Sequence, residues 1–194
     1  MNESIYTKAW YDEARALFGA EYRALADILY DSFKFKTVLD VGCGAGFILE
    51  RLLTQWGVTV RGIDGSACAL EAAAEVVRPF LSVQDLRVPV EPWAPTYDLV
   101  ICTEVAEHLE AKHANTLVES CVAFAAGPIY FTAAPPGQGG TDHINEQEPL
   151  YWITKFEARS DKTLNRDLSA RINRLCALSL PRMPWFAFNG MVFM

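Results

Sequence analysis

Carboxylate side chains follow three short apolar runs of this sequence, the first of them beside a glycine-rich turn. Asp40 stands two residues before the first glycine of a Gly-x-Gly-x-Gly pattern, Asp64 ends the second run, and Asp85 follows the third. Glycines let the backbone turn sharply and approach a ligand closely. Carboxylates accept hydrogen bonds from ammonium, diol and adenine amino groups, and they repel pyrophosphate. The three acids therefore predict a site for a ligand that carries an ammonium, a diol and an adenine.

The spacing of the glycines separates this turn from a dinucleotide-binding one. The dinucleotide fingerprint is Gly-x-Gly-x-x-Gly, and Phe47 occupies its last glycine position here. Glycine turns before a helix are nevertheless shared with nucleotide-binding proteins, because the helix N-terminus offers free N–H groups. A nicotinamide-dependent dehydrogenase therefore stays an alternative, and it would bind NAD(H) in a titration.

A second set of polar residues follows the fourth apolar run, in the segment TEVAEH at 103–108. On a helix, Glu104, Glu107 and His108 would share one face, and His143 lies in a later loop at the same edge of the fold. Two carboxylates and two imidazoles can hold a divalent cation such as Mg²⁺ or Mn²⁺. Such an ion would lower the pKa of a bound hydroxyl, so these four residues are candidate metal ligands.

The same residues also have an explanation without a metal. Glu104 and Glu107 can be acids at a helix start, which the helix dipole favours, and His108 can pack beside the ligand. His143 is then the first candidate for a general base, because histidine titrates near neutral pH. The catalytic candidates are therefore His143, His108 and Glu104.

Strand-like and helix-like runs alternate along the chain. β-branched runs predict strands at residues 37–41, 58–63, 81–83, 97–102 and 128–133, with helices at 8–33, 47–56, 67–77 and 111–125. Pro89, Pro92 and Pro95 break the chain before the fourth strand. Helices are further expected at 150–158 and 168–177, and a last strand at 189–194. This alternation predicts an α/β fold with a parallel sheet and right-handed crossovers.

The segment 134–149 is rich in glycine and proline and has no element of its own. It follows the fifth strand, so it lies at the edge where open α/β sheets bind ligands. Aromatic residues on either side can stack on a substrate or cover a cofactor. These are Tyr6, Trp10, Tyr11, Tyr151 and Trp152. Tyr151 and Trp152 are the stronger candidates for substrate contact, because they follow this loop directly.

Composition narrows the classes of protein. Of 194 residues, 51% are hydrophobic, yet no run is long enough to span a membrane. The N-terminus lacks the apolar block of a secretory signal, and the five cysteines contain no CxxC pair. We therefore expect a cytoplasmic protein with reduced thiols. The net charge of −7 disfavours nucleic acid as a partner.

The ordered segments VLDVGCGAGFILERL, GIDGS, VQDL and YDLVICTEVAEHL resemble the motif set of the class I S-adenosylmethionine (SAM)-dependent methyltransferases, over residues 35–135. The resemblance implies a Rossmann-like, mostly parallel sheet of seven strands flanked by helices, with one antiparallel strand. It also implies that SAM is the cofactor. The implied cofactor-binding residues are Asp40, Gly42, Cys43, Gly44 and Gly46 for the methionine part, Asp64, Gly65 and Ser66 for the ribose, and Asp85 and Leu86 for the adenine.

Glu104, Glu107, His108 and His143 match the metal-using small-RNA 2′-O-methyltransferases, and the Glu-x-x-Glu-His part also resembles the ubiquinone-pathway O-methyltransferases. We expect one methyltransferase domain over residues 1–194, with a helical cap (1–34), the SAM-binding core that carries the resemblance (35–135) and a substrate-side part (136–194). The favoured function is O-methylation of a small-molecule hydroxyl, on a sugar or a phenol. Metal-dependent RNA 2′-O-methylation and a non-catalytic SAM-binding role are the alternatives. The acceptor, the pathway and the oligomeric state stay open.

Overall fold

The computed structural model describes residues 5–90 and 96–194, and these form a central sheet with helices on both faces. Within them the sheet has six strands in the order β3-β2-β1-β4-β5-β6. The strands are β1 (Thr37–Val41), β2 (Thr59–Asp64), β3 (Leu81–Val83), β4 (Leu99–Thr103), β5 (Ile129–Thr132) and β6 (Met191–Phe193). Pro92 and Pro95, which were expected to break the chain before β4, lie outside the described residues.

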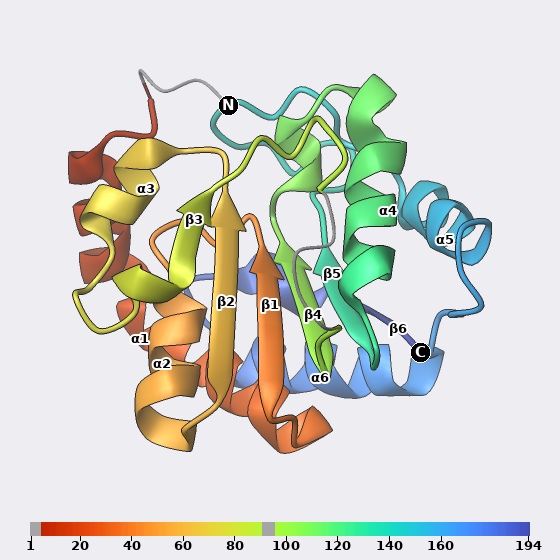
Figure 1. Ribbon diagram of the computed structural model, residues 1–194. Helices are drawn as coiled ribbons and strands as arrows, with labels where there is room; N and C mark the ends of the chain where they lie inside the picture. Colours follow the sequence, from red (N-terminus) through yellow and green to blue (C-terminus); the bar gives the residue numbers. More distant parts are fainter. Residues whose placement is uncertain (1–4, 91–95) are drawn as a thin grey trace.

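Five of the strands are parallel, and β6 pairs antiparallel with β5. The four central strands β1, β2, β4 and β5 are mainly buried, as expected for strands covered on both faces. The carboxyl ends of the parallel strands meet at one edge, the upper edge in Figure 1, where the N-terminal segment and the loop after β5 also lie. The predicted α/β fold with a mostly parallel sheet is confirmed.

Two layers of helices cover the sheet (Figure 1). The helices are α1 (Lys8–Phe33), α2 (Phe47–Trp56), α3 (Ala67–Ala72), α4 (Ala114–Phe124), α5 (Pro149–Glu157) and α6 (Arg166–Ser179). The apolar side chains of α1, α2 and α6 share one core cluster with the sheet, and those of α4 and α5 share the other. None of the helices in the described part of the chain is both long and apolar enough to cross a bilayer.

The expected seventh strand is reduced to a single bridge. Leu164 forms an antiparallel bridge with Phe193, and the backbones of Thr163 and Met194 exchange two hydrogen bonds. The Asn165 amide adds one more bond, to the Val192 carbonyl at 2.8 Å, and the chain then enters α6, whose N-cap is Asn165. The expectation of seven full strands was therefore wrong, although the chain still runs along the outer side of β6.

Two predicted helices are shorter in the structure. The helix expected at 67–77 ends at Ala72, because Ala73 turns extended and places Ala73 and Val77 in the core beside Leu81. The helix expected at 111–125 begins with a 3-10 turn, and α4 proper starts at Ala114. At the end of α3 and at the start of α4, tertiary packing therefore overrides the local helix propensity of the sequence.

Candidate active site

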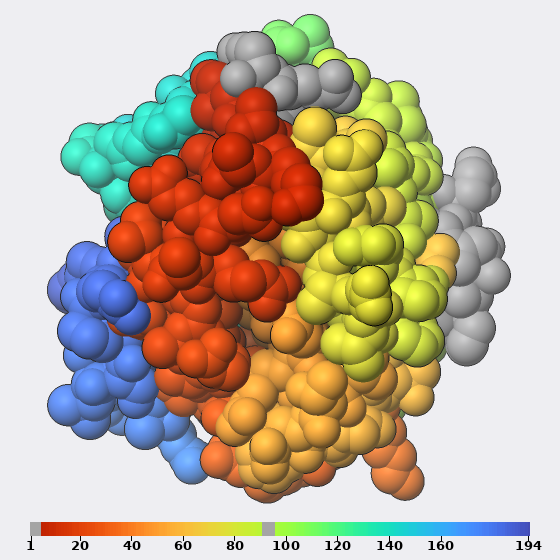
Figure 2. Space-filling model, turned by 90° about the vertical axis from the view of Figure 1, so that its left-hand side faces the viewer, coloured from red at the N-terminus to blue at the C-terminus, as the bar shows by residue number. Residues whose placement is uncertain are grey.

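A cavity of about 440 Å³ opens at the carboxyl edge of the sheet. Its floor comes from the ends of β1, β2 and β4, and its roof comes from the N-terminal segment and α1. Figure 2 shows α1, in red, lying over this side of the molecule beside α3 and β3 in yellow. The cavity therefore lies where open α/β sheets bind ligands.

The turn between β1 and α2 forms the floor of the cavity. Gly42 has φ 83°, and a Cβ there would overlap the side chain of Val105, so only glycine fits this position. The amides of Gly42 and Cys43 donate to the Ile63 carbonyl at 2.8 and 3.0 Å, and the Gly44 amide donates to Asp64 Oδ2 at 2.8 Å. These three amides therefore have partners inside the protein and are not free to bind a phosphate.

Asp64 closes the turn from the end of β2. Its Oδ1 accepts from the Ser66 amide at 2.8 Å and its Oδ2 from the Gly44 amide at 2.8 Å. The residue is 2% exposed, and burial raises the pKa of its carboxyl. The two backbone donors fix the carboxylate in the cavity wall, and each oxygen keeps a lone pair for a ligand hydroxyl.

Asp40 lies beside Asp64 and is equally buried. Its Oδ1 has no hydrogen-bond partner among the described residues. Burial and the neighbouring charge of Asp64 raise the pKa of Asp40 to about 8. A buried, unpartnered carboxyl oxygen is costly, and a cationic ligand in the cavity would relieve that cost.

The other predicted cofactor residues lie around this floor. Gly42, Cys43 and Gly44 line the cavity with Asp40 and Asp64. Asp85 lies on the surface and pairs with Arg87 at 2.8 Å, which lowers the pKa of Asp85 to about 2. Neither Asp85 nor four further candidates line the cavity: Gly46 at the N-cap of α2, Gly65 and Ser66 after β2, and Leu86 after Asp85.

A second polar group lies across the cavity from the glycine turn. One potential ligand atom from each of Glu107, His108 and His143 lies within 4.8 Å of the other two. Glu107 is fully buried, and neither of its carboxylate oxygens has a hydrogen-bond partner in the part of the chain that the structure describes. Burial and the charge of Glu104 raise the pKa of Glu107 to about 8. This unpartnered carboxylate beside two imidazoles fits a divalent cation by ligand type.

The segment that carries these residues is not the α-helix that was expected. Glu104 has φ 53°, and only residues 106–108 form a 3-10 turn. The Glu104 carboxylate is turned toward two amide side chains, accepting from Gln138 at 3.2 Å and from Asn189 at 3.4 Å. The structure therefore groups three of the four predicted metal ligands and leaves Glu104 outside the group.

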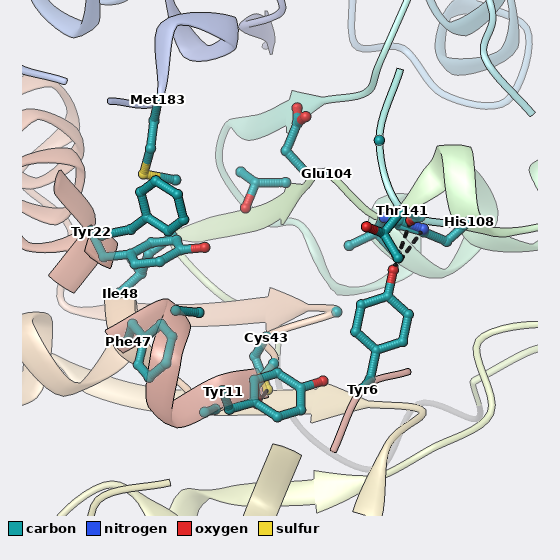
Figure 3. Close-up of a pocket in the computed structure, with 18 of the residues that line it drawn as sticks. Tyr6, Tyr11, Tyr22, Cys43, Phe47, Ile48, Glu104, His108, Thr141 and Met183 are labelled. Carbon is teal, nitrogen blue, oxygen red and sulfur yellow. Dashed lines mark hydrogen bonds between the residues drawn. The ribbon is translucent and has the colours of Figure 1, made fainter. Parts of the chain in front are cut away.

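His108 is held by the backbone of the loop after β5. Its Nδ1 lies 3.1 Å from the Asp142 carbonyl oxygen, and because a carbonyl only accepts, Nδ1 carries the proton. The Tyr6 hydroxyl donates to the Thr141 carbonyl at 3.0 Å and lies 3.3 Å from His108 Nδ1. Figure 3 shows Tyr6 pointing toward His108 and Thr141. Burial lowers the pKa of His108, so its Nε2 keeps a free lone pair at neutral pH.

Of the five aromatic residues predicted to contact a ligand, three lie in the roof of the cavity and two lie outside it. Tyr6, Trp10 and Tyr11 line the cavity and stack edge to face in sequence. Tyr151 and Trp152 do not line it: Trp152 is 1% exposed and packs on Phe131 in the core beneath α5. Their predicted role in substrate contact was wrong, because α5 packs against α4, away from the cavity.

An apolar wall that the sequence did not reveal completes the cavity. It consists of Phe18, Tyr22, Phe47, Ile48, Met183, Trp185 and Phe186. Figure 3 shows Tyr22, Phe47 and Met183 gathered on the side opposite Tyr6 and His108. The aromatic cluster MPWFAF at 183–188 was a visible signal, but only the fold brings it to α1 and α2.

The chain is similar to known methyltransferases over part of its length. The family described as a methyltransferase domain matches residues 38–126. Ubiquinone biosynthesis O-methyltransferase from Bordetella avium (strain 197N) is 35% identical over 111 residues, covering 54% of this chain and 45% of that protein. Its counterpart from Paraburkholderia xenovorans (strain LB400) is 38% identical over 91 residues, covering 44% and 38%. The chain thus spans less than half the length of these relatives.

The fold resembles a solved methyltransferase over nearly its whole length. Magnesium protoporphyrin IX methyltransferase (ChlM) from Synechocystis PCC 6803, with bound SAH, superposes with a TM-score of 0.65 at 16% identity. The superposition covers 98% of this chain and 95% of that one. The ordered motifs and the match over residues 38–126 make this part of the chain similar to SAM-dependent methyltransferases, and the sheet order gives the whole described chain a methyltransferase-like fold.

Proposed function

We propose that this protein transfers a methyl group from SAM to a hydroxyl of a small aromatic molecule. The observation that carries the proposal is one cavity that joins three parts: buried acids at the glycine turn, a His–Glu group and an aromatic wall. Under this proposal, cofactor binding, proton removal and acceptor binding would each use a different part of the cavity. The aromatic wall favours a phenolic acceptor over a sugar, since planar rings pack well against aromatic side chains.

The acids at the glycine turn suit SAM. Asp40 would pair with the methionine ammonium, which gives its unpartnered Oδ1 a charge-assisted donor. Asp64 would accept the ribose hydroxyls, and Asp85 with the Leu86 backbone would bind the adenine once Arg87 moves aside. The turn amides have internal partners, which supports SAM over a pyrophosphate-containing dinucleotide.

Residues of this chain would place and activate the acceptor. Bound SAM supplies an electrophilic methyl group on a good leaving group. The protein then needs to align the acceptor hydroxyl and take its proton. His143 is the candidate base, and the His108 ring packs beside it. Tyr22 and Phe47 would hold the acceptor ring.

A divalent cation at Glu107, His108 and His143 is part of the proposal. The support is the buried Glu107 carboxylate without a partner and the mutual distances within 4.8 Å. When bound, an Mg²⁺ or Mn²⁺ ion would lower the pKa of a coordinated phenol. The relatives named ubiquinone biosynthesis O-methyltransferases support an oxygen acceptor.

Calorimetry followed by a methyl-transfer assay tests the function. We expect the purified protein to bind S-adenosylhomocysteine and to methylate a panel of catechols and phenols with labelled SAM. EDTA should abolish turnover, and Mg²⁺ or Mn²⁺ should restore it. Absence of binding would overturn the cofactor assignment. Full turnover in EDTA would remove the cation and leave His143 as base.

A further inference from the structure

The loop between β5 and α5 wraps around a single carboxylate, that of Glu146. Its Oε2 accepts from the Gly137 amide at 2.8 Å, and its Oε1 accepts from the Gly139 amide at 2.8 Å. The same Oε1 lies 3.0 Å from His143 Nδ1. The side chain of Glu146 is 20% exposed and that of His143 is 11% exposed. Three groups from two halves of the loop thus converge on one side chain.

The loop has a second, independent anchor. The amides of Ile144 and Asn145 both donate to the Glu107 carbonyl, at 2.9 and 3.0 Å. This backbone clamp fixes where the Cα of His143 stands, whatever residue occupies position 146. The contact of Glu146 with the His143 ring is therefore not needed to hold the backbone of the loop. It acts instead on the orientation and protonation of that ring.

The chemistry of this contact selects one tautomer. Both carboxylate oxygens of Glu146 accept from backbone amides, as an ionised carboxylate, which has no donor, does. His143 Nδ1 must therefore carry the proton, which leaves the lone pair on Nε2. That Nε2 lies 4.0 Å from Glu107 Oε1, inside the His–Glu group.

The opposite side of the ring is closed as well. Gly140 has φ 156°, and a Cβ there would overlap the His143 ring. The His108 ring packs edge to face on His143, with ring centroids 4.9 Å apart. A flipped ring would lose the Glu146 contact and turn Nδ1 toward Glu107. Gly140 and His108 therefore fix the plane of the His143 ring. Glu146 determines that Nε2, and not Nδ1, points toward Glu107.

We propose that Glu146 is a positioning residue, which holds His143 with an unprotonated Nε2 facing Glu107 and ties the glycine half of the loop to it. This inference deepens the proposed function and rests on it for its catalytic meaning. An unprotonated Nε2 is what either a cation or a phenolic proton requires. Partners of this kind fix the tautomer of ligand or base histidines.

Nitrogen-15 NMR of the histidine rings tests the proposal without any substrate. The chain has only three histidines, so the His143→Ala spectrum assigns the ring. We expect wild-type His143 to show a protonated Nδ1 and an unprotonated Nε2. In Glu146→Gln the amide can donate to Nδ1, so we expect a mixture of tautomers. Glu148→Gln, on an exposed neighbour without such contacts, is the matched control and should leave the spectrum unchanged.

Kinetics supply the second measurement. Glu146→Gln should lower kcat roughly 10–100-fold and leave the KM for SAM within about twofold, since Glu146 does not touch the glycine turn. A wild-type spectrum with a protonated Nε2, or a Glu146→Gln protein with wild-type spectrum and kcat, would overturn the proposal. If no acceptor is methylated at all, the proposed function fails, yet the ring spectra still decide the role of Glu146.

Discussion

The burial of Asp40 affects both its pKa and its ability to bind a cationic ligand. Asp40 lies beside a second buried acid, and its raised pKa means that the free protein keeps it protonated at neutral pH. Pairing with an ammonium group requires the ionised form. Binding of a cationic amino acid moiety must therefore expel a proton from this position.

This proton release makes cofactor affinity depend on pH. With a pKa of about 8 for Asp40, the affinity for S-adenosylhomocysteine should rise about tenfold per pH unit between pH 6 and 7.5. Calorimetry in buffers of different ionisation enthalpy should report about one proton released. Asp40→Asn should bind weakly and without this slope. An affinity that is constant over this range in the wild type would contradict the role of Asp40.

Sequence reasoning worked best for single residues whose chemistry is local. The glycine turn, Asp40 and Asp64 were predicted because strand ends and turn residues are encoded by neighbours in the chain. Gln138, Asn189 and Met183 were missed. Gln138 and Met183 line the cavity, and Asn189 donates to Glu104 and Gln138. The path of the chain after β5 and after α6 brings these residues there, and no local pattern encodes that path.

Among the elements, the segment after β4 shows where periodicity fails. The spacing of Glu104, Glu107 and His108 favoured one helical face, yet Glu104 takes a left-handed conformation. The Glu104 amide donates to the carbonyl and hydroxyl oxygens of Thr132 at 3.2 and 3.0 Å. This bond to β5 continues the sheet and prevents a helix from starting there.

The turn between β1 and α2 provides a test at the scale of an element. Gly42→Ala should destabilise the protein by about 2–5 kcal/mol, because a positive φ costs about 1–2 kcal/mol and overpacking against Val105 about 1–3 kcal/mol. Gly57→Ala is the control. Gly57 also has a positive φ, but nothing lies within 4 Å of a Cβ there, so Gly57→Ala should lose only about 1–2 kcal/mol, the cost of the positive φ.

Urea unfolding measures both variants. The double variant Gly42→Ala/Val105→Ala should lose less stability than the sum of the two single variants, because the second change removes the overlap. Equal losses for Gly42→Ala and Gly57→Ala would show that Val105 does not restrict the turn.

The buried acids make the free energy of unfolding of the whole molecule depend on pH. An acid whose pKa is higher in the folded state than in the unfolded state, near 3.9 for aspartate, binds its proton more tightly when folded. The unfolding free energy of the free protein should therefore fall as pH rises from about 5 to 8, by up to about 1.4 kcal/mol per pH unit for each such group. Asp40 and Glu107 are two such groups.

Urea midpoints at pH 6 and pH 8 check this expectation. Wild-type protein should be less stable at pH 8, and Asp40→Asn should show a smaller difference that retains the part due to Glu107. Saturating S-adenosylhomocysteine should recover stability at pH 8 by mass action. Greater stability of the free wild-type protein at pH 8 than at pH 6 would contradict the burial of these acids.

Tyr6 gives the molecule one more property. Its hydroxyl joins the N-terminal segment to the loop after β5 through Thr141 and His108. The segment before α1 and the loop before α5 are therefore joined at one side chain, and moving either of them away from the other would break the Tyr6 contacts. A ligand that enters the proposed active site between these two segments would therefore have to break the Tyr6 contacts with Thr141 and His108.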